Sequence, residues 1–244
     1  MGQPTFVRGL WGFPKELASG IWQNVDRARS DIESARLFPH QPTPIRYFVL
    51  GCENAEHLNT LGYETILLDD EPLLNFTGAA ERNPSPDGKV QYGLSVWRHK
   101  MEIMKTAMLG TGGPIVWLDW DVNTDRPIPP DFWDCLDAGQ PLQLKIMRFV
   151  RPQCPWRGAD TRLLGHGGLI YCRDVGFIQD AIDWQMENPL YTDEHAFSWV
   201  IDQHTGGWKG IEHYHEDGWE PYCYHCRKQP YPAEVPMFRE YRGR

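Results

Sequence analysis

Short apolar, β-rich runs alternate with helix-like stretches through the first half of this 244-residue chain, and this alternation limits the possible folds most strongly. Candidate strands cover residues 6–11, 45–50 and 63–68, and residues 55–61 are typical of a short helix between the last two. Alternation of this kind predicts a parallel sheet with right-handed helical crossovers. We therefore expect an α/β fold with a mixed, mostly parallel sheet flanked by helices.

The rest of the chain continues with both kinds of element. Apolar residues at three- and four-residue steps predict an amphipathic helix over 93–109, which the polar loop 75–92 precedes. Further expected strands cover 114–122, 141–149, 169–172 and 211–215, and further expected helices cover 21–37, 132–136, 175–187 and a stretch that begins near 192. We expect one domain over 1–226, followed by a basic, proline-containing tail over 227–244 that is frayed or wrapped over the surface.

Charge and cysteine content limit the location and the partners. The 24 basic and 33 acidic residues give a formal net charge of −9, which argues against nonspecific attraction to nucleic acid phosphates. The chain has no apolar run long enough to span a bilayer and no signal-peptide pattern at its N-terminus. Its thinly spread cysteines suit a reducing compartment. We expect a cytoplasmic protein, or one in the host cytoplasm if a phage encodes it, without a membrane partner.

The most specific chemical signal is the apolar run 114–122, which carries Asp119 and Asp121 at its end. A buried strand that opens into a loop would place both carboxylates at the carboxyl edge of the sheet, where open α/β sheets bind ligands. A carboxylate pair there suits a divalent cation that carries a phosphorylated ligand. The alternative is a solvated turn in which the aspartates cap the next segment.

Several segments, in their order along the chain, resemble the D-x-D type of nucleotide-sugar-dependent glycosyltransferases of the GT-A fold. They are a helix with a basic stretch at 98–100, the acidic strand end 117–122, a turn and strand at 166–170, an acidic helix start at 193–197, and a late histidine segment at 211–214. Their order is stronger evidence than any single motif. The resemblance implies a single-domain, GT-A-like (Rossmann-like) fold and an enzyme, a hexosyltransferase, that moves a sugar from a nucleoside-diphosphate sugar, with UDP expected, to an acceptor hydroxyl.

The resemblance also implies a metal site made of Asp119, Asp121 and His213. Oxygen and imidazole ligands together suit Mn²⁺, and Mg²⁺ less well because it prefers oxygen. A cation there would stabilise the charge that develops on the leaving diphosphate. Asp121 is the better candidate for direct coordination, because Asp119 lies deeper in the strand and could act through water or the ribose hydroxyls.

Other residues are candidates for binding the substrates. Arg98 and Lys100 could neutralise phosphate oxygens, or could simply form a solvated helix face. Trp11 could stack on the base, or could belong to the core. The remaining substrate-binding candidates are Arg8 and Gly9 at the end of the first strand, Trp120 within the acidic motif, and His166, Gly167 and Gly168 on the acceptor side.

The catalytic candidates are Asp193 and Glu194. An inverting transfer needs a carboxylate that takes the acceptor hydroxyl proton, and either residue could serve at a helix N-terminus. The helix dipole there is expected to lower the pKa and weaken the base. The alternative role is capping of that helix. The pattern leaves retaining and inverting outcomes open.

Two other classes of protein compete with the transferase. His213, His215, Cys223 and Cys226 have an H-x-H then C-x-x-C spacing, which suits a structural Zn²⁺ site. A nucleotidyltransferase would share the sheet and the cation chemistry, although the glycine-rich phosphate loop typical of those enzymes is poorly matched here. A phosphohydrolase or nuclease that uses the two aspartates is a weaker third alternative.

The acceptor is open among three kinds of molecule: a glycan, a protein, or a hydroxymethylated pyrimidine in phage-type DNA. The acidic net charge disfavours DNA, whereas the basic tail keeps it in consideration.

Overall fold

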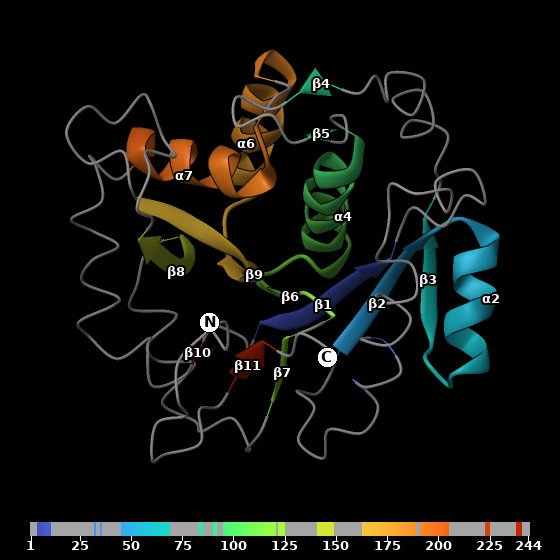
Figure 1. The fold of residues 1–244 in the computed structure, drawn as a ribbon. Coiled ribbons are helices and arrows are strands. Elements are labelled where there is room, and N and C mark those ends of the chain that lie inside the picture. Colours follow the sequence, from blue (N-terminus) through green and yellow to red (C-terminus); the bar gives the residue numbers. More distant parts are fainter. Residues whose placement is uncertain are drawn as a thin grey trace.

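A six-stranded mixed sheet forms the centre of the molecule (Figure 1). The computed structural model describes residues 4–10, 32, 35, 45–68, 83–84, 90–91, 95–120, 122–124, 141–148, 163–188, 191–204, 223–224 and 238–240. The strand order is β3-β2-β1-β6-β9-β8. The strands are β1 (Thr5–Leu10), β2 (Ile45–Leu50), β3 (Thr65–Leu68), β6 (Ile115–Leu118), β8 (Leu142–Arg148) and β9 (Leu163–Cys172).

Pairing in the sheet is mostly parallel, as the sequence predicts. β1 pairs in parallel with β2 and β6, and β2 pairs in parallel with β3. β9 runs antiparallel to both of its neighbours, β6 and β8. The chain therefore places β2 and β3 on one side of β1 and β6 on the other. Such a reversal of strand order leaves a crevice outside the carboxyl ends of the strands, where α/β proteins bind ligands.

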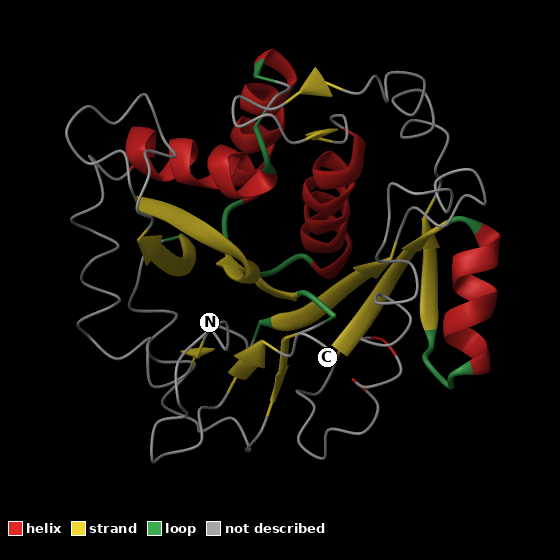
Figure 2. Ribbon diagram, viewed as in Figure 1, coloured by secondary structure: helices red, strands yellow, loops and turns green. Residues whose placement is uncertain are grey.

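Four helices flank this sheet in the described part of the chain (Figure 2). They are α2 (Cys52–Thr60), α4 (Ser95–Thr111), α6 (Val175–Glu187) and α7 (Asp193–His204). The bounds of α6 agree with the sequence prediction, and Asp174 caps its start by accepting a hydrogen bond from Gly176 N–H at 2.9 Å. None of the described helices combines the length and apolar composition that crossing a bilayer requires.

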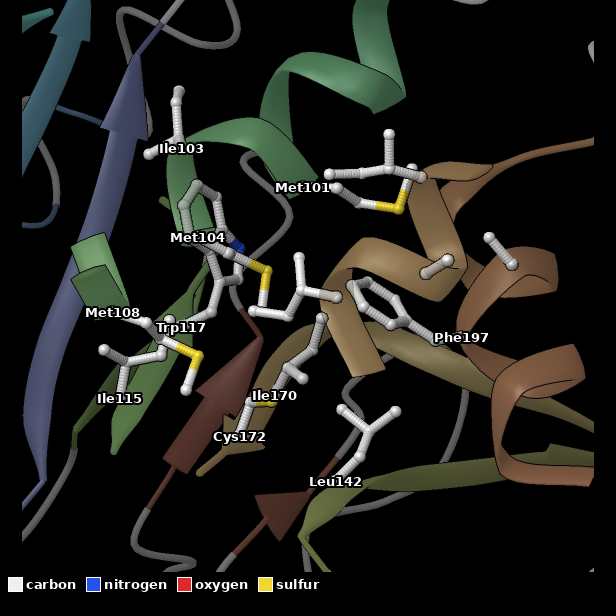
Figure 3. Packing of buried hydrophobic residues seen from close by; sticks show 14 of the residues in the cluster. Met101, Ile103, Met104, Met108, Ile115, Trp117, Leu142, Ile170, Cys172 and Phe197 are labelled. Atoms are coloured by element: carbon white, nitrogen blue, oxygen red, sulfur yellow. The ribbon is translucent and has the colours of Figure 1, made fainter. Parts of the chain in front are cut away.

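Apolar side chains pack against both faces of the sheet. Because side chains alternate along a strand, Phe48 and Leu50 join the cluster under α4, α6 and α7, whereas Val49 joins a smaller cluster that includes Leu58 of α2. The larger cluster holds Trp117 and Phe197, which lie among methionines of α4 (Figure 3). This core fixes α4 and α7 relative to the end of β6, where the acidic motif begins.

Three local expectations about secondary structure were wrong. β9 begins at Leu163, so the glycine-rich stretch 165–168 lies inside a strand and does not merely precede one. The expected strand 114–122 ends at Leu118, and Val122–Thr124 forms a separate short strand, β7, although a loop was expected from Asn123 on; β11 (Phe238–Glu240) pairs with β7 antiparallel. Within the expected loop 75–92, β4 (Asn83–Pro84) and β5 (Val90–Gln91) pair antiparallel.

The C-terminal region contributes a small separate sheet. β11 also pairs with β10 (Cys223–Tyr224), which gives the order β10-β11-β7. Residues of the predicted tail 227–244 thus reach the strand that follows the acidic motif, and the domain boundary near 226 stays a prediction. The expected elements at 132–136 and 211–215 lie outside the described residues, as does the helix 21–37 apart from the helical residues Ile32 and Ala35.

Candidate functional site

Lys100 is the centre of a buried charged cluster at the carboxyl edge of β6. It lies on α4, and its side chain is only 6% exposed. Its ammonium group is 3.1 Å from Asp119 Oδ1 and 3.0 Å from Asp193 Oδ2, and it donates to the Gly167 carbonyl oxygen at 2.5 Å. Burial opposes the charge of Lys100, but the two carboxylates more than offset this and raise its pKa above the ordinary value.

The contacts of Lys100 limit what it can do. An ammonium group has three N–H donors, and these three acceptors account for all of them. The alternative prediction, that Lys100 belongs to a solvated helix face, is therefore wrong. A direct contact with a phosphate would require exchanging one of its acceptors, so Lys100 in this structure positions Asp119 and Asp193. Arg98 also lies on α4, but its side chain is not among the described ones.

Asp119 follows β6 directly and stays accessible. Its side chain is 38% exposed although Lys100 binds it, and its backbone N–H donates to the Gly168 carbonyl at 2.8 Å. The Asp119 carbonyl accepts a hydrogen bond from Val122 N–H at 3.0 Å, so backbone contacts hold both sides of the acidic motif. The expected placement of Asp119 at the end of a buried strand is confirmed, since Asp119 directly follows Leu118, the last residue of β6. Asp121 lies outside the described residues.

The start of α7 brings two more carboxylates to the cluster. Asp193 is the first residue of the helix, and its buried carboxylate binds Lys100. Glu194 Oε1 accepts a hydrogen bond from Gly167 N–H at 3.0 Å. Gly167 therefore uses both of its backbone polar groups in the cluster. A Cβ atom there would lie 2.9 Å from Asp193 Oδ2 and 3.0 Å from Lys100 Nζ, so a larger residue at this position would force these two charged groups to shift.

The expected effect of the helix dipole was wrong for Glu194. Burial and the neighbouring charge of Asp193 raise the pKa of Glu194 to about 7, although the Gly167 N–H and Lys100 act in the opposite direction. A carboxyl group with a pKa near neutrality can take up and release a proton at physiological pH. Glu194 is thus the better candidate of the two for proton transfer, because Asp193 is committed to Lys100.

We expect the raised pKa of Glu194 to make stability depend on pH. From its ordinary value of 4.5 up to about 7, the unfolded chain releases this proton while the folded chain retains it. The free energy of unfolding should therefore fall as pH rises through this window. Thermal melting of wild type and Glu194→Gln between pH 5 and pH 8 measures the effect: the variant should gain stability relative to wild type as pH rises. A difference that stays constant with pH would contradict the shifted pKa.

Arg8, Gly9 and Trp120 form a second group beside the cluster, at the end of β1. Arg8 is 0% exposed, and its guanidinium donates to the Val122 carbonyl at 2.7 Å and to Asn123 Oδ1 at 3.1 Å. It also lies 5.1 Å from the centroid of the Trp120 ring, whose indole N–H donates to the Gly9 carbonyl at 2.8 Å. Arg8 and Trp120 thus connect β1 to the acidic motif and to β7.

Aromatic residues of the neighbouring strand and loop pack around Trp120. Tyr47 stacks on its ring with centroids 5.6 Å apart, and Tyr63 meets it edge-on at 5.5 Å. Close packing explains why a glycine occupies position 9, since a Cβ atom there would lie 2.6 Å from the Trp117 ring. The substrate-binding roles predicted for Arg8, Gly9 and Trp120 stay predictions, and the structure adds a structural role for each.

His166 and Gly168 lie in β9 next to the cluster. His166 is buried, and its Nδ1 accepts a hydrogen bond from Gly168 N–H at 3.3 Å. A Cβ atom on Gly168 would lie 2.5 Å from His166 Cε1 and 3.1 Å from a methyl group of Val122. The two residues therefore pack closely together next to Asp119. Their predicted contacts with the substrate stay predictions.

The remaining predicted site residues lie largely outside the described part of the chain. They are Trp11, Asp121, His213, His215 and Cys226, while Cys223 lies in β10 without a described side chain. Among the described residues, no three His, Cys, Asp or Glu side chains gather as metal ligands. The exposed carboxylate of Asp119 next to Asp121 is nevertheless the type of donor that a divalent cation takes.

Sequence reasoning missed two members of this region. The Trp117 indole N–H donates to Asp119 Oδ1 at 2.7 Å, and the i, i+2 spacing of the two residues across the end of an extended stretch could have indicated this contact. Thr192, which precedes α7, has its hydroxyl 2.8 Å from His195 Nδ1, three residues on. This spacing is that of a capping box and could also have been found.

Fold and site together define a single α/β domain with a Rossmann-like, mostly parallel sheet and a charged cluster at its carboxyl edge. The structure is similar to the crystal structure of mouse xyloside xylosyltransferase 1 in its apo form, with 11% sequence identity, a TM-score of 0.48, and coverage of 98% of this chain and 97% of that chain. The sequence matches no family model, and none of the curated proteins compared with it matches. A similarity at this level says nothing about activity, which must be inferred from the site residues.

Proposed function

We propose that the protein is a metal-dependent glycosyltransferase that moves a sugar from a nucleoside-diphosphate sugar, with UDP as the nucleotide, to an acceptor hydroxyl. One observation carries the proposal: Asp119 is held by Lys100 yet is 38% exposed, at the strand end where the order of the sheet reverses. A phosphorylated ligand binds such a crevice in α/β proteins. The carboxylate of Asp193 binds Lys100 and that of Glu194 binds Gly167 N–H, so both lie in the same cluster, where a transferred sugar and its acceptor need hydrogen-bond acceptors.

The chain supplies a donor set that fits a divalent cation. We assign direct coordination to Asp121 and His213, with Asp119 bound directly or through water. Carboxylate and imidazole donors together suit Mn²⁺ better than Mg²⁺. When bound, such a cation would neutralise the charge of the diphosphate leaving group.

Glu194 is the proposed acceptor of the proton from the attacking hydroxyl. Its pKa of about 7 allows it to be ionised in part at neutral pH and to hold the proton afterwards. The backbone N–H of Gly167 orients one of its oxygens. Lys100 contributes indirectly, since it fixes Asp193 beside Glu194 and Asp119 at the mouth of the site.

Calorimetry of UDP binding tests the proposal. Wild type should bind UDP more tightly with Mn²⁺ than without it, and Asp121→Ala should lose this metal-dependent part of the affinity. A lost contact of about 3 kcal/mol corresponds to a drop of more than about a hundredfold. Asp183→Ala removes an exposed aspartate of α6 and should bind as wild type does. Undiminished metal-dependent affinity in Asp121→Ala would remove the central role of this residue.

Product analysis separates the transferase from the competing classes. Sugar nucleotides that raise the melting temperature with Mn²⁺ identify the donor, because a ligand that binds only the folded state stabilises it. With that donor, glycan, peptide and hydroxymethylated DNA acceptors can be tested for a transferred sugar. Release of a nucleotidyl product instead of a glycoside would favour the nucleotidyltransferase.

A further inference from the structure

Trp117 combines a place in the core with a polar contact to the site. It lies on β6, is 1% exposed, and belongs to the cluster that contains Ile103 and Met104 (Figure 3). Its indole N–H reaches out of this core and donates to Asp119 Oδ1 at 2.7 Å. A buried indole N–H normally needs such a partner, and here the partner is a residue of the candidate site.

Asp119 Oδ1 receives a second donor from the other side. Lys100 Nζ is 3.1 Å from the same oxygen and 5.5 Å from the centroid of the Trp117 ring, so all three groups lie together. One carboxylate oxygen with two N–H donors is fixed in direction. The side chain still keeps 38% of its surface exposed, which leaves the carboxylate able to reach a ligand.

We propose that Trp117 is a positioning residue, whose indole N–H and Lys100 together hold the inner oxygen of Asp119 so that only the outer oxygen, Oδ2, faces the ligand. This inference rests on the proposed function and deepens it. Asp119 then contributes a single oxygen to a cation, a cation-bound water or a ribose hydroxyl, and never a bidentate contact. The same arrangement explains why Gly9 lies against the Trp117 ring: a Cβ atom there, 2.6 Å from the ring, would displace the indole.

The first test is Trp117→Phe, which keeps an aromatic ring and removes the N–H donor. Substitutions that disturb the residues orienting a metal ligand usually cost about ten- to hundredfold in metal affinity. Metal-dependent UDP affinity should fall by about that factor, while UDP affinity without Mn²⁺ stays unchanged. Trp184→Phe, a matched change of a buried tryptophan on α6, should alter neither. Equal metal-dependent affinity in Trp117→Phe and wild type would overturn the inference and leave the proposed function intact.

A second test does not need UDP binding. In ¹H–¹⁵N spectra of the full-length wild type, the indole resonance of Trp117 is identified by its absence from Trp117→Phe. Asp119→Asn replaces the charged acceptor and should shift this resonance, whereas the Trp184 indole resonance should not move. An unshifted Trp117 resonance would overturn the inference even if the protein bound no sugar nucleotide, and a shift without UDP binding would support the contact while the proposed function failed.

Discussion

Lys100→Met should destabilise the fold by about 3–5 kcal/mol and abolish the proposed sugar transfer. The substitution removes the one ammonium group that binds Asp119 Oδ1, Asp193 Oδ2 and the Gly167 carbonyl. Breaking a buried ion pair from one side is costly because it leaves the opposite charge buried without compensation. Urea unfolding at pH 7 measures the free energy.

Two further variants test whether the loss of stability comes from the charged cluster and not simply from removing a lysine. Lys105→Met changes a partly exposed lysine on the same helix and should alter stability by no more than about 0.5 kcal/mol. Lys100→Met combined with Asp193→Asn removes one of the uncompensated charges and should recover part of the stability, so the two substitutions should not be additive. A Lys100→Met protein as stable as wild type would mean that the cluster does not hold the site together.

Arg8→Met should destabilise the protein by about 2–4 kcal/mol and weaken the proposed metal-dependent binding of UDP, although Arg8 is not a proposed metal ligand. Its guanidinium donates to the Val122 carbonyl and to Asn123 Oδ1, and both acceptors lie in buried residues of β7. A buried acceptor that loses its donor costs about 1–3 kcal/mol. Because Val122 N–H in turn bonds the Asp119 carbonyl, a loosened β7 should leave the acidic motif less well fixed.

Arg8→Lys and Arg46→Met are the control variants for Arg8→Met. Urea unfolding measures the stability of each, and calorimetry with UDP and Mn²⁺ measures its affinity. Lysine keeps the charge of Arg8 but lacks the planar fork that reaches two acceptors, so it should recover only part of the loss. Arg46 lies opposite Val7 on the neighbouring strand and is exposed, so its substitution should change little. If Arg8→Met kept full stability and lost only UDP affinity, Arg8 would be a ligand-binding residue, as the sequence first indicated.

Local patterns were sufficient for the elements that a short stretch of sequence defines. The apolar periodicity of α4 predicts a helix that buries one face, and the apolar run of β2 predicts a strand, of which the last three residues are buried. β7 was missed because its three residues become a strand only by pairing with β11, which lies far away in the sequence. The early start of β9 was missed because glycines usually indicate a turn, whereas here they admit the side chains of His166 and Leu144.

The sequence indicated which residues belong to the site better than it indicated what each of them does there. The acidic strand end indicated Asp119, and the helix start indicated Asp193 and Glu194. The burial of Lys100 could not be predicted, since a lysine beside an apolar helix stripe is ordinarily solvated, and its partners come from other elements. The raised pKa of Glu194 likewise depends on burial and on Asp193, which outweigh the local helix effect on which the prediction relied.

The wide sequence separation of the contacts in the cluster has a consequence for how the protein folds. The hydrogen bond from Lys100 to Gly167 spans 67 residues, and the one from Arg8 to Val122 spans 114. Closing loops of such length costs conformational entropy before the contacts can stabilise the chain. The charged groups should therefore come together late in folding. During synthesis, the charged cluster cannot be complete until α7 has left the ribosome, because a nascent chain that stops short of this helix lacks Asp193, one of the three partners of Lys100.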